Sequence, residues 1–404
     1  MKKRWLLPVA SVMIPAQIAV ILAACASDEE TGGVPREQTY YPPADAAPAP
    51  SPDGSDATDA EVPCVEGDCV YYPTECTEGA LCLDALFAAS DGLDLRTYVT
   101  SISGRSPSDI WLSGTVGTVA HFDGTAWRRS IVDTQQSLSV IWLHGDSEIA
   151  FGDPKRLYTR GLDAGVDAEA SADGWSFLDT TKVPPQWGGG FMRLETSFAY
   201  PGADSLWIGV SSQTDSGGLW RMRWSVENNR FQVVGTTLRK CTYVPCREVS
   251  GLHGASADEI WAVGPRGAAF RVTNAESDAP TLTTFNTLTR DALDGVWAAA
   301  SDDVWAVGAL GTVRRYRGDA RFWEVYDAVP TKQHLHAVAG SSPNDIWIAG
   351  DEGTVFHFDG ATWTRVKVAG LGARRPRLDH IWVPSPGKVW IAGQGVLVSL
   401  GGKP

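Results

Sequence analysis

The chain has 404 residues, 48 of them acidic and 34 basic, and its formal net charge is −14. Sixteen acidic residues and one basic residue lie between Cys25 and Asp94, so the rest of the chain is close to neutral. A nearly neutral main domain excludes the broad basic field typical of nucleic-acid binding, and it excludes a strongly acidic field for cations.

Residues 1–24 have the layout of a secretory signal peptide. Three basic residues at positions 2–4 precede an apolar stretch that reaches Cys25. The segment Leu22–Cys25 resembles a bacterial lipobox, which implies that Cys25 is lipidated and becomes the first mature residue. No acidic residue follows directly, so the same resemblance implies the outer membrane as the location. A membrane-spanning helix is the alternative, and Pro8 and Pro15 disfavour it.

Residues 25–63 are rich in Pro, Ala and Asp and poor in large aliphatic side chains. Such a composition cannot bury enough apolar surface to offset the entropy of ordering, so we predict a disordered, extended stalk. The stalk would hold the main domain away from the lipid surface, with the lipid as its only membrane contact.

Residues 64–94 form a cysteine-rich segment that leads into the main domain. Six cysteines remain after Cys25, namely Cys64, Cys69, Cys76, Cys82, Cys241 and Cys246. An even number in an exported protein favours disulfides, and Cys241 and Cys246 are expected to close a local loop. The alternative for the first four is a zinc site, but they lack the paired C-x2-C spacing. The sequence leaves their pairing open.

A short pattern with a central Trp recurs along the chain. The clear copies are DIWLSG at Asp109, EIWAVG at Glu259, DVWAVG at Asp303, DIWIAG at Asp345 and KVWIAG at Lys388. Two looser copies begin at Ser205 and at Glu148, and the latter lacks the Trp. The central tryptophans of the last five copies recur at intervals of 42 to 54 residues, a period typical of a four-stranded propeller blade: Trp207, Trp261, Trp305, Trp347 and Trp390.

Each unit contains material for four short strands. In the unit that begins at Leu335, the segments LHAVAG, DIWIAG, TVFHF and WTRVKV are separated by SSPN, DEG and DGAT. The segments are β-branched and aromatic without helical spacing, and the separators carry turn-forming residues. We therefore predict an all-β fold over residues 95–404, a seven-bladed β-propeller of four-stranded antiparallel blades.

The last unit contains only three strands. We expect the N-terminal segment from Leu81 to Ala89 to supply its fourth strand, because this closure removes an exposed sheet edge and joins the two ends of the domain.

The units from Ser106 to Trp127 and from Ser341 to Trp363 resemble the S-x-x-D-[IV]-W-x-x-G repeats of exported propeller proteins from myxobacterium-like bacteria. They are more distantly similar to photosystem II assembly-factor-like propellers and to Asp-box proteins. An Asp-box has a residue between its Asp and Gly, whereas Asp123 and Gly124 are adjacent. The resemblance therefore does not extend to sialidase activity.

Several polar residues occupy the same position in more than one unit, which indicates a structural role. His121 and His357 share a slot on the third strand, where another unit has Arg315. The acidic residues before the repeat Trp, such as Asp109, Asp303 and Asp345, are expected to bond a turn backbone. We find no nucleophile motif, no phosphate-binding motif and no metal-ligand pattern, so we expect no enzymatic activity, no cofactor and no metal.

Candidate binding residues are those in loops where the units differ. We expect the loops between second and third strands, and those between blades, to share one binding face. The candidates on these loops are Trp187, Arg193, Arg266, Asp351, Glu352, Arg374, Arg375 and Arg377. We expect a monomer that binds a protein partner at the cell envelope. Alternatives are a glycan-binding, lectin-like propeller and a glycoside hydrolase of the sialidase type.

Overall fold

The computed structural model describes residues 70–88, 92–153, 156–162, 169–179, 192–212, 217–225, 227, 230–236 and 248–401. The predicted signal peptide, Cys25, the stalk and Trp187 lie outside these residues, as do Cys64, Cys69, Cys241 and Cys246. Among the described residues, no helix is long and apolar enough to cross a membrane.

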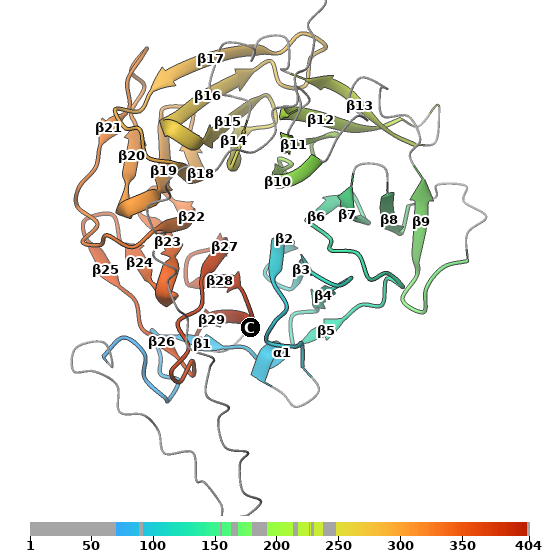
Figure 1. The fold of residues 1–404 in the computed structure, drawn as a ribbon, viewed down its shortest axis with the longest axis horizontal. Helices are drawn as coiled ribbons and strands as arrows, with labels where there is room; N and C mark the ends of the chain where they lie inside the picture. The colour runs from blue at the N-terminus through green and yellow to red at the C-terminus, as the bar shows by residue number, and fades with distance from the viewer. Residues whose placement is uncertain are drawn as a thin grey trace, which may run out of the picture. The chain divides into compact units, whose positions relative to one another are not determined.

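The described chain forms seven antiparallel blades, which confirms the predicted fold (Figure 1). In chain order, blade 1 contains β2(Val99–Ser106), β3(Asp109–Gly114), β4(Val119–Phe122) and β5(Trp127–Arg129). Blade 2 contains β6(Val140–His144), β7(Ser147–Asp153), β8(Arg156–Arg160) and β9(Trp175–Asp179). Blade 3 contains β10(Met192–Phe198), β11(Ser205–Ser212), β12(Gly218–Ser225) and β13(Arg230–Thr236). Blade 4 contains β14(Gly251–Ser256), β15(Glu259–Gly264), β16(Ala268–Thr273) and β17(Thr281–Asn286). Blade 5 contains β18(Leu293–Ala300), β19(Asp303–Gly308), β20(Val313–Tyr316) and β21(Glu324–Val325). Blade 6 contains β22(Leu335–Ser342), β23(Asp345–Gly350), β24(Val355–Phe358) and β25(Trp363–Arg365).

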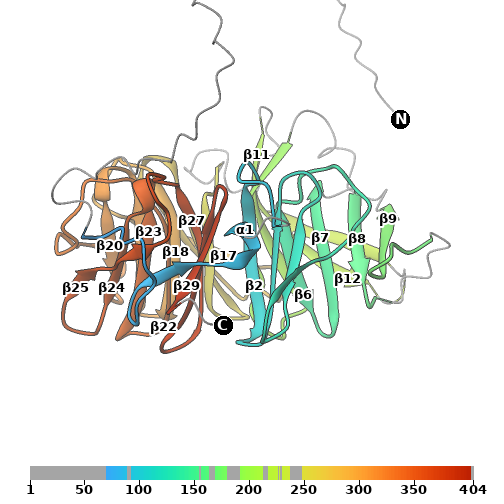
Figure 2. The same ribbon diagram turned by 90° about the horizontal axis from the view of Figure 1, so that it is seen from below.

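Blade 7 contains five strands, one more than predicted. Its own strands are β27(Leu378–Ser385), β28(Lys388–Gly393) and β29(Val396–Leu400). The N-terminal β1(Leu81–Leu83) pairs antiparallel with β29, as predicted, and β26(Val368–Ala369) then adds outside β1 in a parallel pair (Figure 1). Figure 2 shows this blue N-terminal segment on the side of the ring that faces the viewer. The remainder of the predicted donor segment is the short helix α1(Ala85–Ala88). Cys76 and Cys82 form a disulfide that joins β1 to the residues before it.

Blade 7 closes the ring through its first strand, β27. This strand packs against the first strands of both neighbouring blades, β22 of blade 6 and β2 of blade 1. At the closing contact, a Cβ atom on Gly104 would lie 2.5 Å from the ring of Trp382, so only glycine lets that indole approach. The central tryptophans of six repeat units are almost fully buried, which confirms that the repeat Trp builds the core: Trp111, Trp207, Trp261, Trp305, Trp347 and Trp390.

Candidate functional site

The acidic residue of the repeat binds side chains of its own blade. Asp345 Oδ1 accepts hydrogen bonds from Trp347 Nε1 at 2.9 Å and from His357 Nε2 at 2.8 Å. The His357 ring also stacks on Trp347, with centroids 4.2 Å apart. The expectation that this acid bonds a turn backbone was wrong, because its carboxylate accepts instead from the buried indole N–H two residues on.

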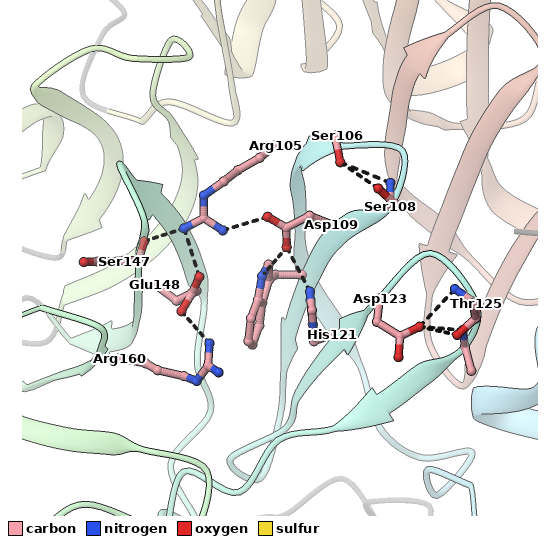
Figure 3. A network of polar contacts seen from close by, with 12 residues as sticks. Arg105, Ser106, Ser108, Asp109, His121, Asp123, Thr125, Ser147, Glu148 and Arg160 are labelled. Carbon is pink, nitrogen blue, oxygen red and sulfur yellow. Dashed lines mark hydrogen bonds and ion pairs between the residues drawn. The ribbon is translucent and has the colours of Figure 1, made fainter.

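Blade 1 repeats this arrangement with Asp109, Trp111 and His121 at 2.9 Å for both hydrogen bonds (Figure 3). In blade 5, Arg315 replaces the histidine and donates to both oxygens of Asp303 at 2.8 and 2.9 Å. In each of these blades the acidic residue is bonded to the His or Arg of the third strand. The repeated third-strand position is therefore structural, as the sequence indicated.

Ion pairs extend the repeated slot from blade 1 to blade 2 (Figure 3). Glu148, whose side chain is only 5% exposed, lies between Arg105 and Arg160 at 2.9 Å from each. Arg105 also contacts Asp109 at 3.0 Å. The two guanidinium groups compensate the buried carboxylate, so loss of either arginine would leave its charge partly uncompensated at this blade interface.

An open hollow of about 470 Å³ lies beside blades 6 and 7 and is lined in part by Asp345, Trp347 and His357. Its polar groups are the repeated structural ones, already bonded to each other. We therefore do not assign the functional site to this hollow.

The loops between second and third strands lie against the connections between blades, as expected. In blade 6, Asp351 N bonds to His334 O at 2.9 Å, and Gly353 N bonds to Pro376 O at 2.7 Å. In blade 1, Gly117 N bonds to Gln136 O at 2.7 Å. We call the face formed by these loops and connections the connection face.

The tips of these loops hold non-glycine residues in the left-handed region. The equivalent tip residues are Val116, Arg266, Leu310 and Glu352, with φ between 54° and 59°. This conformation disfavours a side chain by about 1–2 kcal/mol, and most of all a β-branched one. Each tip therefore carries backbone strain that glycine would relieve.

Two of these strained tips expose large aliphatic side chains. Val116 is 64% exposed and Leu310 is 68% exposed. Leu288, in the connection after blade 4, also has a positive φ of 55° and is 50% exposed. A strained backbone at an exposed apolar residue does not stabilise the fold. We therefore regard Val116, Leu310 and Leu288 as candidates for a contact surface.

Polar side chains gather where the first strands of blades 5, 6 and 7 begin. Each of these strands has a bulge just after its first residue, which places Asp294, His336 and Asp379 at equivalent positions. His334 precedes β22, and Asp351 belongs to the adjacent loop of blade 6. We call Asp294, His334, His336, Asp351 and Asp379 the mouth cluster.

His336 connects two carboxylates of the mouth cluster. Its Nε2 lies 2.8 Å from Asp351 Oδ1, and its Nδ1 lies 3.7 Å from Asp294 Oδ2. Burial disfavours the charged imidazole, but the two carboxylates outweigh burial and raise the pKa of His336. Burial opposes ionisation of Asp294 too, yet its contacts with His336 and His334 lower the pKa of Asp294.

A second group of charges lies next to the mouth cluster. Arg377 forms an ion pair with Asp379, whose side chain is only 5% exposed. Burial, and then the neighbouring Asp379, raise the pKa of Tyr98 above its usual range, whereas the positive charges of Arg377 and Arg193 oppose this. The predicted residues Arg377, Arg193 and Asp351 therefore lie in or near this charged region, although Arg193 is the second residue of β10 and does not lie in a loop as predicted.

Three other predicted binding residues lie in the loop of blade 6 or in the connection to blade 7, namely Glu352, Arg374 and Arg375. Glu352 accepts from Gln333 Nε2 at 2.6 Å, and its backbone oxygen accepts from Tyr72 at 2.6 Å. Arg375 lies over the Tyr72 ring at 3.7 Å, and Arg374 donates to the Gly395 oxygen at 2.9 Å. Arg266 is exposed at its loop tip.

Sequence reasoning missed the aliphatic tips and the mouth histidines. TVG at Thr115 and ALG at Ala309 align with PRG at Pro265 and DEG at Asp351, so the shared x-x-G pattern could have identified all four tips. The segment HLH at His334 occurs in one unit only, which is a signal of a position outside the repeated framework.

No protein-family model matches the chain, and no curated protein matches it in sequence. Solved structures match its fold. YCF48 bound to D1 peptide matches with a TM-score of 0.55 and 17% identity, covering 83% of this chain and 99% of that one. YCF48 from Cyanidioschyzon merolae matches with 0.54 and 19%, covering 76% and 96%. The WD40 β-propeller domain of Doa1 matches with 0.54 and 13%, covering 81% and 96%. At such identities the likeness shows that this chain has the β-propeller fold, and shows no more than that.

Proposed function

We propose that this chain is a non-enzymatic propeller that binds a protein partner with its connection face. The observation that carries the proposal is the set of strained loop tips in blades 1, 4, 5 and 6, where Val116 and Leu310 are exposed aliphatic residues and Arg266 and Glu352 are charged. An aliphatic contact next to charged side chains suits a protein surface, since apolar groups supply affinity and charges supply orientation. The similar YCF48 structure bound to a peptide supports the same use of the fold.

The chemistry of the mouth cluster favours binding over hydrolysis. A glycoside hydrolase needs one carboxyl group whose pKa is raised so that it can donate a proton. Asp294 has the opposite shift, because the two histidines favour its ionised form. A lectin-like propeller would present the same pocket in several blades, whereas the four tips carry Val, Arg, Leu and Glu.

We further propose that lipidation at Cys25 anchors the protein to the outer membrane of a bacterial cell envelope. The lipobox-like segment and the acidic, Pro-rich sequence after it support this part of the proposal. Fatty-acid labelling of the expressed protein should disappear in the Cys25→Ala variant, and labelling that persists would contradict the anchor.

Photo-crosslinking in intact cells tests the binding face. A photoreactive amino acid at Leu310 should give a protein adduct detectable by mass spectrometry, because this side chain is exposed on the connection face. The matched control is Asp302, an exposed residue just before the other end of the same strand, β19. Equal adducts from both positions, or none from Leu310, would contradict the proposal.

A further inference from the structure

Three potential metal-ligating side chains meet at the interface between blades 5 and 6. They are Asp294 from the bulge in β18, His334 from the connection, and His336 from the bulge in β22. One ligand atom from each lies within 4.8 Å of the other two. The His334 and His336 rings stack with their centroids 4.3 Å apart, and each places one nitrogen near Asp294 Oδ2.

One of these ligand atoms is buried and has no hydrogen-bond partner among the described residues. This atom is His336 Nδ1, whose side chain is only 5% exposed. Its other nitrogen, Nε2, is bound to Asp351 at 2.8 Å. When Nε2 donates to that carboxylate, Nδ1 carries a lone pair directed toward Asp294 and His334. Histidines that ligate metals are commonly oriented in this way by a carboxylate on the opposite nitrogen.

From this arrangement we propose that Asp294, His334 and His336 form a binding site for a divalent transition-metal ion of the zinc class, with Asp351 as the group that orients His336. Two imidazole nitrogens and one carboxylate oxygen form a donor set that suits zinc and cobalt, and it leaves coordination positions open to water or to another ligand. The proposal concerns metal binding alone and does not depend on the proposed protein-binding function. It departs from the sequence-based expectation of no metal.

The distances fit such an ion with small side-chain movements. Ligands about 2.1 Å from a tetrahedral ion lie about 3.4 Å from each other. His336 Nδ1 and Asp294 Oδ2 are 3.7 Å apart, close to this value. His334 Nε2 and Asp294 Oδ2 are in direct hydrogen-bond contact, and the ion would replace this bond. His334 and Asp294 remain 33% and 24% exposed, so an ion has access to the site.

The local charge also favours a cation. Three carboxylates, those of Asp294, Asp351 and Asp379, lie around His336, and Arg377 contributes one positive charge. With neutral histidines, the region carries two uncompensated negative charges, which one divalent ion would balance. In addition, Asp379 Oδ2 is buried and has no hydrogen-bond partner within the part of the chain that the structure describes. Histidine protonation is the competing way to balance these charges.

Cobalt titration of the full chain, after removal of metals with a chelator, tests the site. We expect one Co²⁺ per chain, with a visible absorption spectrum that lacks thiolate-to-cobalt charge transfer, because no ligand is a cysteine. Asp294→Asn and His334→Ala should each weaken Co²⁺ binding at least about 10-fold. Asp351→Asn should weaken it about 10- to 100-fold, as expected for a group that orients a ligand. NMR of the seven histidine rings should show paramagnetic broadening at His334 and His336.

His357→Ala is the matched control, since His357 is also paired with an aspartate but belongs to the repeated framework. It should leave Co²⁺ affinity unchanged. Thermal unfolding of each variant separates loss of the site from loss of the fold. Absence of Co²⁺ binding, binding with thiolate charge transfer only, or binding that Asp294→Asn and His334→Ala leave intact would each overturn the proposal.

Discussion

Replacement of Leu81 by Ala should lower the free energy of unfolding of the ring by about 2–5 kcal/mol. Leu81 is fully buried in β1 and pairs with Val368 on one side and Leu400 on the other. The truncation leaves a cavity in the strand that joins the two ends of the propeller, and a weakened β1 exposes the edge of β29. Urea unfolding followed by tryptophan fluorescence measures the change.

Leu95→Ala is the control for this prediction, because it makes the same truncation at a residue that is 48% exposed. Its effect should stay within about 0.5 kcal/mol. If both variants unfold at the same urea concentration, β1 does not close the ring in solution.

Between pH 6.5 and pH 4, His253 should lower the free energy of unfolding by about 3 kcal/mol. Burial lowers the pKa of His253 to about 4, and its Nδ1 accepts a hydrogen bond from Ala298 N at 3.2 Å. Below pH 6.5 the unfolded chain takes up a proton at this histidine while the folded chain does not. The contribution of His253 to stability is therefore complete above pH 6.5 and is lost as the pH decreases toward 4, by up to about 1.4 kcal/mol per unit.

Urea unfolding as a function of pH provides the measurement, with His253→Gln as the comparison. Glutamine does not titrate, so the variant should show a smaller loss of stability over this pH range, whatever its stability at neutral pH. An unchanged slope in the variant would show that other groups cause the acid sensitivity.

The sequence predicted the fold because the repeat encodes it several times. Trp and Gly at fixed positions predict the blades, and the incomplete last unit predicts the closure by β1. The fifth strand of blade 7 was not predictable, since Val368 and Ala369 are two residues whose pairing depends on where β1 lies. The place of this segment in the folded chain, beside β1, decides its secondary structure, and its local sequence pattern does not.

The candidate site was less predictable than the fold. Loop variation indicated Arg266 and Glu352 correctly as residues of the second-to-third-strand loops, but positive φ values, which mark the tips, are a property of the backbone. The mouth cluster joins Asp294 to His336 across 42 sequence positions, and only the ring brings them together. The role of Asp345 was missed because the indole it binds was expected to serve packing alone.

We propose that the repeated side chains hold the blades together while the loop tips bind a protein partner. Crosslinking and thermal unfolding measured on the same two variants test it most directly, with the photoreactive residue placed at Arg377, which is half exposed. Leu310→Asp should abolish the adduct and leave the melting temperature unchanged. Asp345→Ala should lower the melting temperature, because Trp347 and His357 lose their acceptor, and should keep the adduct below that temperature. An adduct that survives Leu310→Asp but disappears from folded Asp345→Ala would contradict the account.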